Sequence, residues 1–153
     1  MGKSGFYQID KIRYIIREIK MNEKVYLICP VRNCSAEVQQ EIEWYVNELE
    51  KNGKEVHYPP RDVDQSQSEF IICHSHKMAM KDCDEIHIWW DNKSTGSHFD
   101  LGMAFMLLEI NPSLIFVLAN PQDVPKTIQK SFGNLIRNIS HARDCTSINN
   151  LTI

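Results

Sequence analysis

Short apolar runs alternate regularly along this chain with longer segments of helical periodicity. The apolar runs are rich in β-branched and aromatic residues and cover 24–29, 54–58, 85–90 and 113–118. Consecutive apolar side chains are typical of strands that are buried on both faces of a parallel sheet. Apolar residues at helical spacing mark the segments between them, which are 36–51, 69–82 and 98–110. We therefore expect an α/β domain with a parallel sheet of about four to five strands, flanked by helices.

Local signals set the ends of several elements. Ser35 is expected to cap the first of these helices, and Asn52-Gly53 is expected to end it. Pro59-Pro60 ends the second strand, because proline cannot continue a central ladder of hydrogen bonds. The polar segment 61–68 is expected to be an exposed loop, and a last helix is predicted near 124–136.

The first 22 residues are expected to form an additional amphipathic helix, ahead of an α/β domain that covers 23–153. This prediction rests on a stripe of isoleucines at helical spacing: Ile9, Ile12, Ile15, Ile16 and Ile19. We expect this helix to pack on the domain or on a second subunit. Its polar face lacks the heavy basic bias that a membrane-surface helix requires.

Composition narrows the class of protein. The chain has 153 residues and a net charge of −3, so it lacks the basic excess with which proteins grip duplex nucleic acid. The five cysteines are odd in number and do not form close pairs, which argues against a secreted disulfide scaffold. No apolar stretch reaches the length of a membrane span, and the N-terminus lacks the apolar core of a secretory signal. We expect a cytoplasmic protein without membrane or duplex nucleic-acid partners.

Three loops are candidates for a binding site, because α/β sheets bind ligands beyond the carboxyl ends of their strands. These loops are 30–35, 59–66 and 91–98. The third contains the run Ser94-Thr95-Gly96-Ser97, which leads directly into a helix. The free N–H groups of a first helical turn attract anions, and glycine lets the backbone approach a ligand closely. Ser97 is the expected N-cap, although an ordinary capped connection has the same pattern.

Asp100 is the strongest candidate for a functional carboxylate. It falls in the first turn of the predicted helix 98–110, which is so apolar that we expect it to be buried nearly all round. Gly102 within that helix predicts tight packing against the sheet or a ligand. Asp91 follows Trp90 at the carboxyl end of the third strand, where it is a candidate partner. Trp90 itself is a candidate wall for a nucleobase.

The remaining polar residues of the three loops are candidate ligand contacts. Arg61, beside Asp62, has the geometry to bind a carboxylate or phosphate bidentately, or to form a local ion pair instead. The first loop contributes Pro30, Arg32 and Asn33. His98 is either an acid or base near neutral pH or a half-exposed residue at the start of a helix.

The run Cys73-His74-Ser75-His76 invites a metal hypothesis, but a helix puts residues 73 and 76 on one face and His74 elsewhere. Without an obvious fourth ligand the signal is weak, so we expect no metal and no cofactor. A cysteine nucleophile has no support beyond the presence of cysteine and histidine.

The runs KVYLICPVRN, EVHYPPRD, KDCDEIHIWWDNKSTGSHFDLGMAF and SLIFVLANP together resemble the nucleoside 2-deoxyribosyltransferase superfamily. The resemblance covers about residues 24–121 and is most specific at 82–105. It implies a single Rossmann-like, flavodoxin-like domain that cleaves an N-glycosidic bond through a covalent deoxyribosyl-enzyme. It also implies a homo-oligomer, in which Asn120 or the C-terminal tail completes a neighbour's site.

By position, the resemblance makes Asp100 the nucleophilic carboxylate and Asp91 the acid near the base. Ser94, Gly96 and Ser97 match the loop that holds a 5′-phosphate. The family nucleophile is usually glutamate, and aspartate is shorter by one carbon–carbon bond, about 1.5 Å. A misplacement of that order can reduce the rate about 100-fold.

These observations favour an enzyme that acts on a nucleoside or nucleoside 5′-monophosphate by deoxyribosyl transfer or hydrolysis. The alternative is a module on the same fold that binds or senses a nucleotide ligand without turnover. A third hypothesis is an interaction protein that uses the N-terminal helix and the tail.

Overall fold

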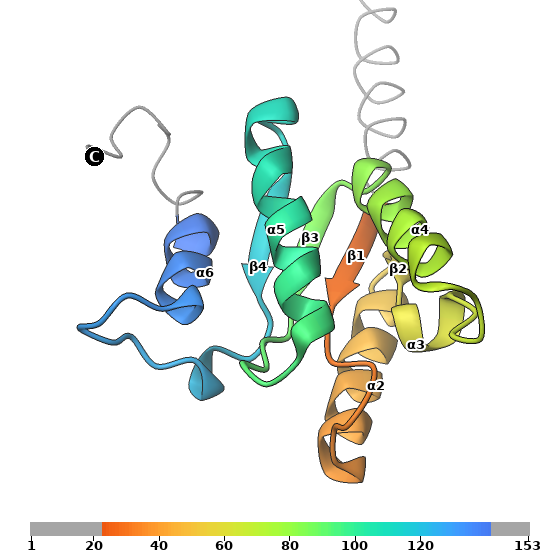
Figure 1. The fold of residues 1–153 in the computed structure, drawn as a ribbon, viewed down its shortest axis with the longest axis horizontal. Coiled ribbons are helices and arrows are strands. Elements are labelled where there is room, and N and C mark those ends of the chain that lie inside the picture. The colour runs from red at the N-terminus through yellow and green to blue at the C-terminus, as the bar shows by residue number, and fades with distance from the viewer. Residues whose placement is uncertain (1–22, 142–153) are drawn as a thin grey trace, which may run out of the picture.

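The computed structural model describes residues 23–141, which form a Rossmann-like α/β domain around one parallel sheet (Figure 1). The expected N-terminal helix and C-terminal tail lie outside the described residues. The strands are β1 (Lys24–Ile28), β2 (Glu55–His57), β3 (Glu85–Ile88) and β4 (Ile115–Leu118). The helices are α2 (Ala36–Lys51), α3 (Pro59–Asp62), α4 (Glu69–Lys81), α5 (Thr95–Ile110) and α6 (Phe132–His141). The α/β class predicted from the alternation of apolar runs is confirmed.

The strand order is β2-β1-β3-β4, and every neighbouring pair is parallel. This is the order of the first four strands of a flavodoxin-like sheet, in which ligands bind where the order reverses, between β1 and β3. Tyr26 on β1 pairs with Ile86 on β3, so the carboxyl ends of these two strands open side by side. The topology therefore marks one end of the β1–β3 pair as the place to look for a site.

Each face of the sheet has its own apolar core, because alternate strand residues point to opposite faces. One face carries Tyr26 and Ile28, over which α4 and α5 pack (Figure 1). Ile136 and Ile139 of α6 join this core beside β4. The other face carries Val25 and Leu27 and is covered by Ile42 and Val46 of α2.

The start of α5 differs from the prediction. Ser94, not Ser97, is the N-cap, and its side-chain oxygen accepts a hydrogen bond from the backbone N–H of Ser97 at 3.3 Å. Both serines suit a cap, so the sequence signal was ambiguous. The helix begins three residues early, and Asp100 falls in its second turn rather than its first. The helix dipole therefore contributes less to its environment than we expected.

Two other predicted elements also differ. The helix predicted near 124–136 lies further along the chain, because α6 starts only at Phe132 after an irregular segment. The Ser131 side chain accepts from the backbone N–H of Asn134 and so marks the real beginning of α6. The turn after β2 is a short helix, α3, which begins at a proline because the first helical position needs no N–H donor.

The helix α5 is not buried nearly all round, as the sequence predicted. Asp100, Leu101 and Ala104 face the sheet, whereas Met106 and Ile110 are exposed. Gly102 also faces outward, and a Cβ atom there would meet nothing within 4 Å. The expected packing of Gly102 against the sheet is therefore wrong. Among residues 23–141, no helix is long and apolar enough to cross a membrane.

Candidate functional site

A pocket of about 440 Å³ opens at the carboxyl ends of β1 and β3, between the first turns of α4 and α5. The structure brings together there six of the predicted residues: Arg32, Asn33, Asp91, Ser94, Gly96 and Asp100. Pro30 is buried beside the lining residues Cys29 and Val31. The position agrees with the rule that α/β ligands bind where the strand order reverses.

Asp100 is the buried acid of this pocket, with only 6% of its surface exposed. Its Oδ2 accepts a hydrogen bond from the Tyr26 hydroxyl at 2.9 Å. Its Oδ1 lies 3.1 Å from Nδ1 of His76 on α4. Partners from two other elements thus fix the orientation of this carboxylate, which a buried acid needs to avoid a large desolvation cost.

Tyr26 and His76 were not predicted as site residues. A hydroxyl in an otherwise apolar strand usually has a buried partner, so Tyr26 did carry a signal, but nothing in the sequence identified that partner. Burial, and then the charge of Asp100, raise the pKa of the Tyr26 hydroxyl far above its usual value. Tyr26 therefore stays protonated and remains a hydrogen-bond donor to Asp100.

His76 combines the features of a proton-handling residue. It is 7% exposed and lines the pocket. Its Nε2 atom is buried and has no hydrogen-bond partner among the described residues. When Nδ1–H donates to the carboxylate, Nε2 of the neutral ring is a free acceptor. The Asp100–His76 pair resembles the carboxylate–imidazole pairs that orient a general base.

The start of α5 borders the pocket through Ser94, Thr95 and Gly96, whereas the predicted Ser97 does not line it. Thr95 and Gly96 line it, in the first turn where N–H groups are free. Ser97 is 1% exposed, and its hydroxyl donates to Ser94 Oγ at 2.9 Å. Lys93, which was not predicted, also lines the pocket and adds a cation beside these N–H groups. This combination suits an anionic group.

A second hollow of about 690 Å³ lies on the other side of the loop that follows β3, and Asn33, Asp91 and Lys93 line both. Trp90 and His98 face this hollow, with ring centroids 4.7 Å apart. Trp90 therefore does not form a wall of the pocket of Asp100, as the sequence predicted, but borders this neighbouring hollow.

Asn120 has a structural partner that explains its burial. Its side-chain oxygen accepts from the backbone N–H of Trp90 at 2.8 Å, and its amide nitrogen donates to the Trp90 carbonyl at 3.0 Å. Asp91, the next residue, accepts from the Lys93 backbone N–H at 2.9 Å. These bonds shape the loop after β3, so Asn120 positions the loop within its own chain.

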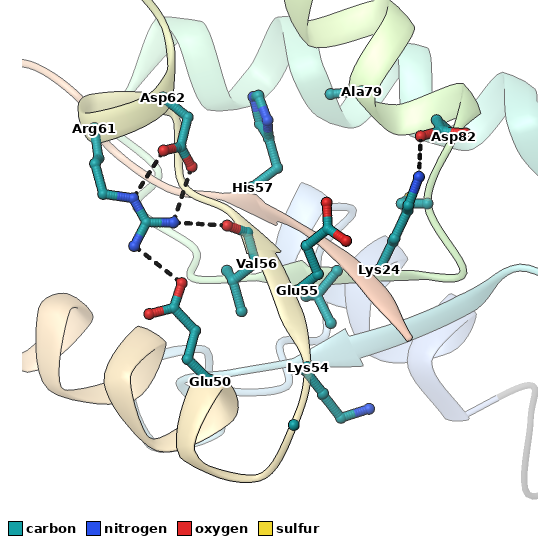
Figure 2. Close-up of a pocket in the computed structure, with 13 residues that line it drawn as sticks. Lys24, Glu50, Lys54, Glu55, Val56, His57, Arg61, Asp62, Ala79 and Asp82 are labelled. Atoms are coloured by element: carbon teal, nitrogen blue, oxygen red, sulfur yellow. Dashed lines mark hydrogen bonds and ion pairs between the residues drawn. The ribbon is translucent and has the colours of Figure 1, made fainter. Parts of the chain in front are cut away.

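Arg61 and Asp62 lie apart from this pocket. They line a separate pocket of about 760 Å³ along the edge strand β2 (Figure 2). The Arg61 guanidinium binds the Asp62 carboxylate, the Val56 carbonyl and Glu50. Burial alone would raise the pKa of Asp62, but the Arg61 hydrogen bond and the Tyr58 N–H lower it overall. Arg61 therefore forms the local ion pair, which is one of the two hypotheses that the sequence left open.

The cysteine and histidine cluster on α4 divides between two faces of the helix. Cys73 and His76 line the pocket, whereas His74 stacks on Phe70 with ring centroids 6.1 Å apart. Residues 23–141 contain no group of three or more histidine, cysteine or acidic side chains that is placed to hold a metal ion. Burial raises the pKa of Cys29, so this thiol at the pocket floor stays protonated.

The sequence matches no protein-family model, and no curated protein is significantly similar to it.

Proposed function

We propose that the protein cleaves the N-glycosidic bond of a nucleoside or nucleoside 5′-monophosphate, by deoxyribosyl transfer or by hydrolysis. The observation that carries this proposal is the buried Asp100 carboxylate, held by Tyr26 and His76 in a pocket where the strand order reverses. Two acids, Asp100 and Asp91, line the same pocket, as the cleavage of glycosidic bonds requires.

In the proposed reaction, Asp100 faces the anomeric carbon, and Asp91 protonates the departing base. The bond between C1′ and the base nitrogen breaks, and its electron pair stays with the base. A bond forms between C1′ and an Asp100 oxygen, or the carboxylate stabilises the cationic sugar while water attacks. In the covalent route, water or a second base attacks C1′, the bond between C1′ and the Asp100 oxygen breaks with its electron pair returning to the carboxylate, and Asp91 takes back the proton that the attacking group loses. In the direct route, the attacking water gives its proton to Asp91. The oxocarbenium-like charge of the transition state is stabilised by the carboxylate, which Tyr26 and His76 hold in place.

An anionic 5′-phosphate would lie at the start of α5. Lys93 supplies a positive charge there, and the free N–H groups of Thr95 and Gly96 supply donors. Arg32 is exposed at the rim of the same pocket. These groups favour a nucleotide over an uncharged nucleoside, in line with the phosphate loop that the family resemblance implies.

The test is incubation of the purified chain with deoxynucleosides and their 5′-monophosphates, with and without an acceptor base, and chromatography of the released base. We expect release or exchange by the wild type and a loss of at least about 100-fold for Asp100→Asn. Glu41→Gln, an exposed acid on α2 at the opposite face of the sheet, is the matched control and should keep full activity. Binding without base release by the wild type would reject the catalytic role.

A second candidate function, nucleotide binding without turnover, is favoured by one observation. Both oxygens of Asp100 already have partners inside the chain, and aspartate reaches less far than the glutamate usual in the resembling family. Thermal-shift screening with nucleoside monophosphates separates the two candidates. A raised melting temperature without product supports binding without turnover, and a raised melting temperature with product supports the enzyme.

A further inference from the structure

The pocket of Asp100 and the neighbouring hollow share one wall, which includes the loop after β3. Asn33, Asp91 and Lys93 line both cavities, whose volumes are about 440 Å³ and 690 Å³. A nucleoside monophosphate bound at Asp100 occupies the first cavity and leaves the second without a ligand. The second cavity also falls within the range of about 300–1,000 Å³ that is usual for small-molecule sites. One ligand can therefore reach both cavities if it crosses the shared wall.

The shared wall presents a cation that has no partner. Lys93 is exposed on it, and its ammonium group forms no hydrogen bond or ion pair within residues 23–141. Asp91 lies on the same wall, where its carboxylate accepts from the backbone N–H of Lys93 rather than from the ammonium group. The free N–H groups at the start of α5 add donors on the side of the pocket. A ligand that crosses here should therefore carry negative charge, as phosphate groups do.

The hollow beyond the wall contains a cluster of three aromatic rings, from Trp90, His98 and Phe132. The ring centroids of His98 lie 4.7 Å from Trp90 and 5.1 Å from Phe132. Trp90 is buried, whereas Phe132 is 54% exposed and so has ring surface left for a ligand. Stacking on an aromatic side chain strengthens the binding of a nucleobase about 5- to 150-fold, whichever base it is.

Hydrogen-bond acceptors accompany these rings. His98 Nδ1 lies 2.7 Å from the backbone oxygen of Ser94, which accepts its proton, so Nε2 of the neutral ring is an acceptor. Asp123 also lines the hollow and adds a carboxylate. Such acceptors suit the amino groups that adenine, cytosine and guanine carry on their edges. Rings and acceptors together make a nucleobase the ligand that this hollow fits best.

We propose that the two cavities bind a single ligand, a dinucleotide whose two nucleosides are joined by a pyrophosphate. The first nucleoside lies in the pocket of Asp100, the pyrophosphate crosses the wall at Lys93, and the second base stacks on Phe132. This inference rests on the proposed function, which places the glycosidic bond of the first nucleoside at Asp100. Cleavage breaks the same bond between C1′ and the base nitrogen, and the second nucleotide contributes binding alone.

The test is isothermal titration of the full-length chain with 5′–5′ pyrophosphate dinucleotides of the four common deoxynucleosides. Each dinucleotide is compared with its own nucleoside monophosphate and diphosphate. The diphosphate has the same two phosphorus atoms but no second nucleoside, so the difference between the two affinities measures the contribution of the hollow. We expect at least one dinucleotide to bind at least about tenfold more tightly than its monophosphate and its diphosphate.

Phe132→Ala removes the exposed ring of the hollow and leaves the pocket of Asp100 untouched. We expect the dissociation constant of the dinucleotide to rise about tenfold and that of the monophosphate to stay within about twofold. Unchanged binding of the monophosphate also shows that the variant is folded. The matched control is Phe105→Ala on α5, a phenylalanine of similar exposure (47%) that lines neither cavity, and it should change neither constant.

The same titrations, with chromatography of the released base, separate this inference from the proposed function. Tighter binding of a dinucleotide without release of base supports the two-cavity ligand and rejects the catalytic role. Release of base from a monophosphate, with no dinucleotide bound more tightly than its diphosphate, overturns the two-cavity ligand and leaves the catalytic role standing. A Phe132→Ala variant that binds the dinucleotide as tightly as the wild type also overturns it.

Discussion

His76 Nδ1 lies 3.1 Å from Asp100 Oδ1, while the other oxygen of the same carboxylate accepts from Tyr26. The contact joins α4 to α5 at the carboxyl ends of the strands, and Nε2 of His76 has no hydrogen-bond partner among residues 23–141. The histidine thus orients the acid through one ring nitrogen only. Stability and chemistry at this pocket should both depend on it.

Replacing His76 tests whether its hydrogen bond to Asp100 stabilises the fold. His76→Leu leaves Asp100 with one partner fewer in a buried place, and we expect a loss of about 2 kcal/mol of folding stability. His76→Asn keeps an N–H donor near the Nδ1 position and should recover at least half of that loss. Denaturant unfolding measures both variants. Equal destabilisation by the two would show that packing, rather than the hydrogen bond to Asp100, is what matters.

Tyr26→Phe removes only the hydroxyl, since the ring keeps its volume. We expect a loss of about 1–2 kcal/mol at neutral pH, because Asp100 Oδ2 loses a donor. The folded-state pKa of Tyr26 is raised, so its contribution is complete below pH 10 and declines as pH rises above it, when the unfolded chain ionises. The melting temperature of the variant should therefore fall less steeply between pH 10 and 11 than that of the wild type. If the melting temperatures of the variant and the wild type fell equally steeply over this pH range, the hydrogen bond from Tyr26 to Asp100 would not explain the loss of stability.

The layout of the sheet could be predicted from sequence because it rests on local patterns. Four apolar runs predicted four strands, and Ser35 was rightly predicted to cap α2. The Asp100 contacts could not be predicted in this way, because Tyr26 and His76 are 74 and 24 residues away along the chain. Only the folded strands and helices bring them together.

The start of α5 could not be predicted from the sequence for a different reason. Ser94 and Ser97 are both good caps, and the choice between them depends on which bonds the loop after β3 can make. The structure selects Ser94, whose backbone oxygen also lies 2.7 Å from His98 Nδ1. A shift of three residues was enough to move Asp100 into the second helical turn and Gly96 into the first.

Replacing Asn120 tests whether this residue positions the loop after β3. Asn120→Ala leaves both the N–H and the carbonyl of Trp90 without their buried partner, and we expect a loss of about 2–3 kcal/mol. Asn120→Asp keeps the acceptor but loses the donor, so it should also be destabilising. Thermal unfolding of the full chain measures both. A normal melting temperature in Asn120→Ala would show that the loop after β3 does not depend on this residue.

Glu85 anchors a buried polar network on the α2 face that the sequence did not reveal. Its carboxylate lies 2.6 Å from His87 Nε2 and accepts from Lys54 Nζ at 2.8 Å, and His87 Nδ1 lies 2.7 Å from the Tyr45 hydroxyl. Glu85 and His87 alternate with isoleucines, a pattern that normally places polar residues in solvent. Here both are buried, and the network ties α2 to β3 and to the segment before β2.

The network predicts an acid-sensitive fold. The His87 hydrogen bond, and then Lys54, lower the pKa of Glu85 to about 2 against the opposing effect of burial. Because the folded-state pKa is depressed, the stabilisation is complete above the ordinary value of 4.5 and disappears as pH falls towards 2.

Glu85→Gln should lose about 2 kcal/mol at pH 7, and its melting temperature should converge with that of the wild type by pH 2. Glu41→Gln, an exposed acid on the same side of the sheet, should follow the wild type throughout. A constant gap between wild type and Glu85→Gln from pH 7 to pH 2 would mean that the Glu85 charge contributes nothing and that its packing alone matters.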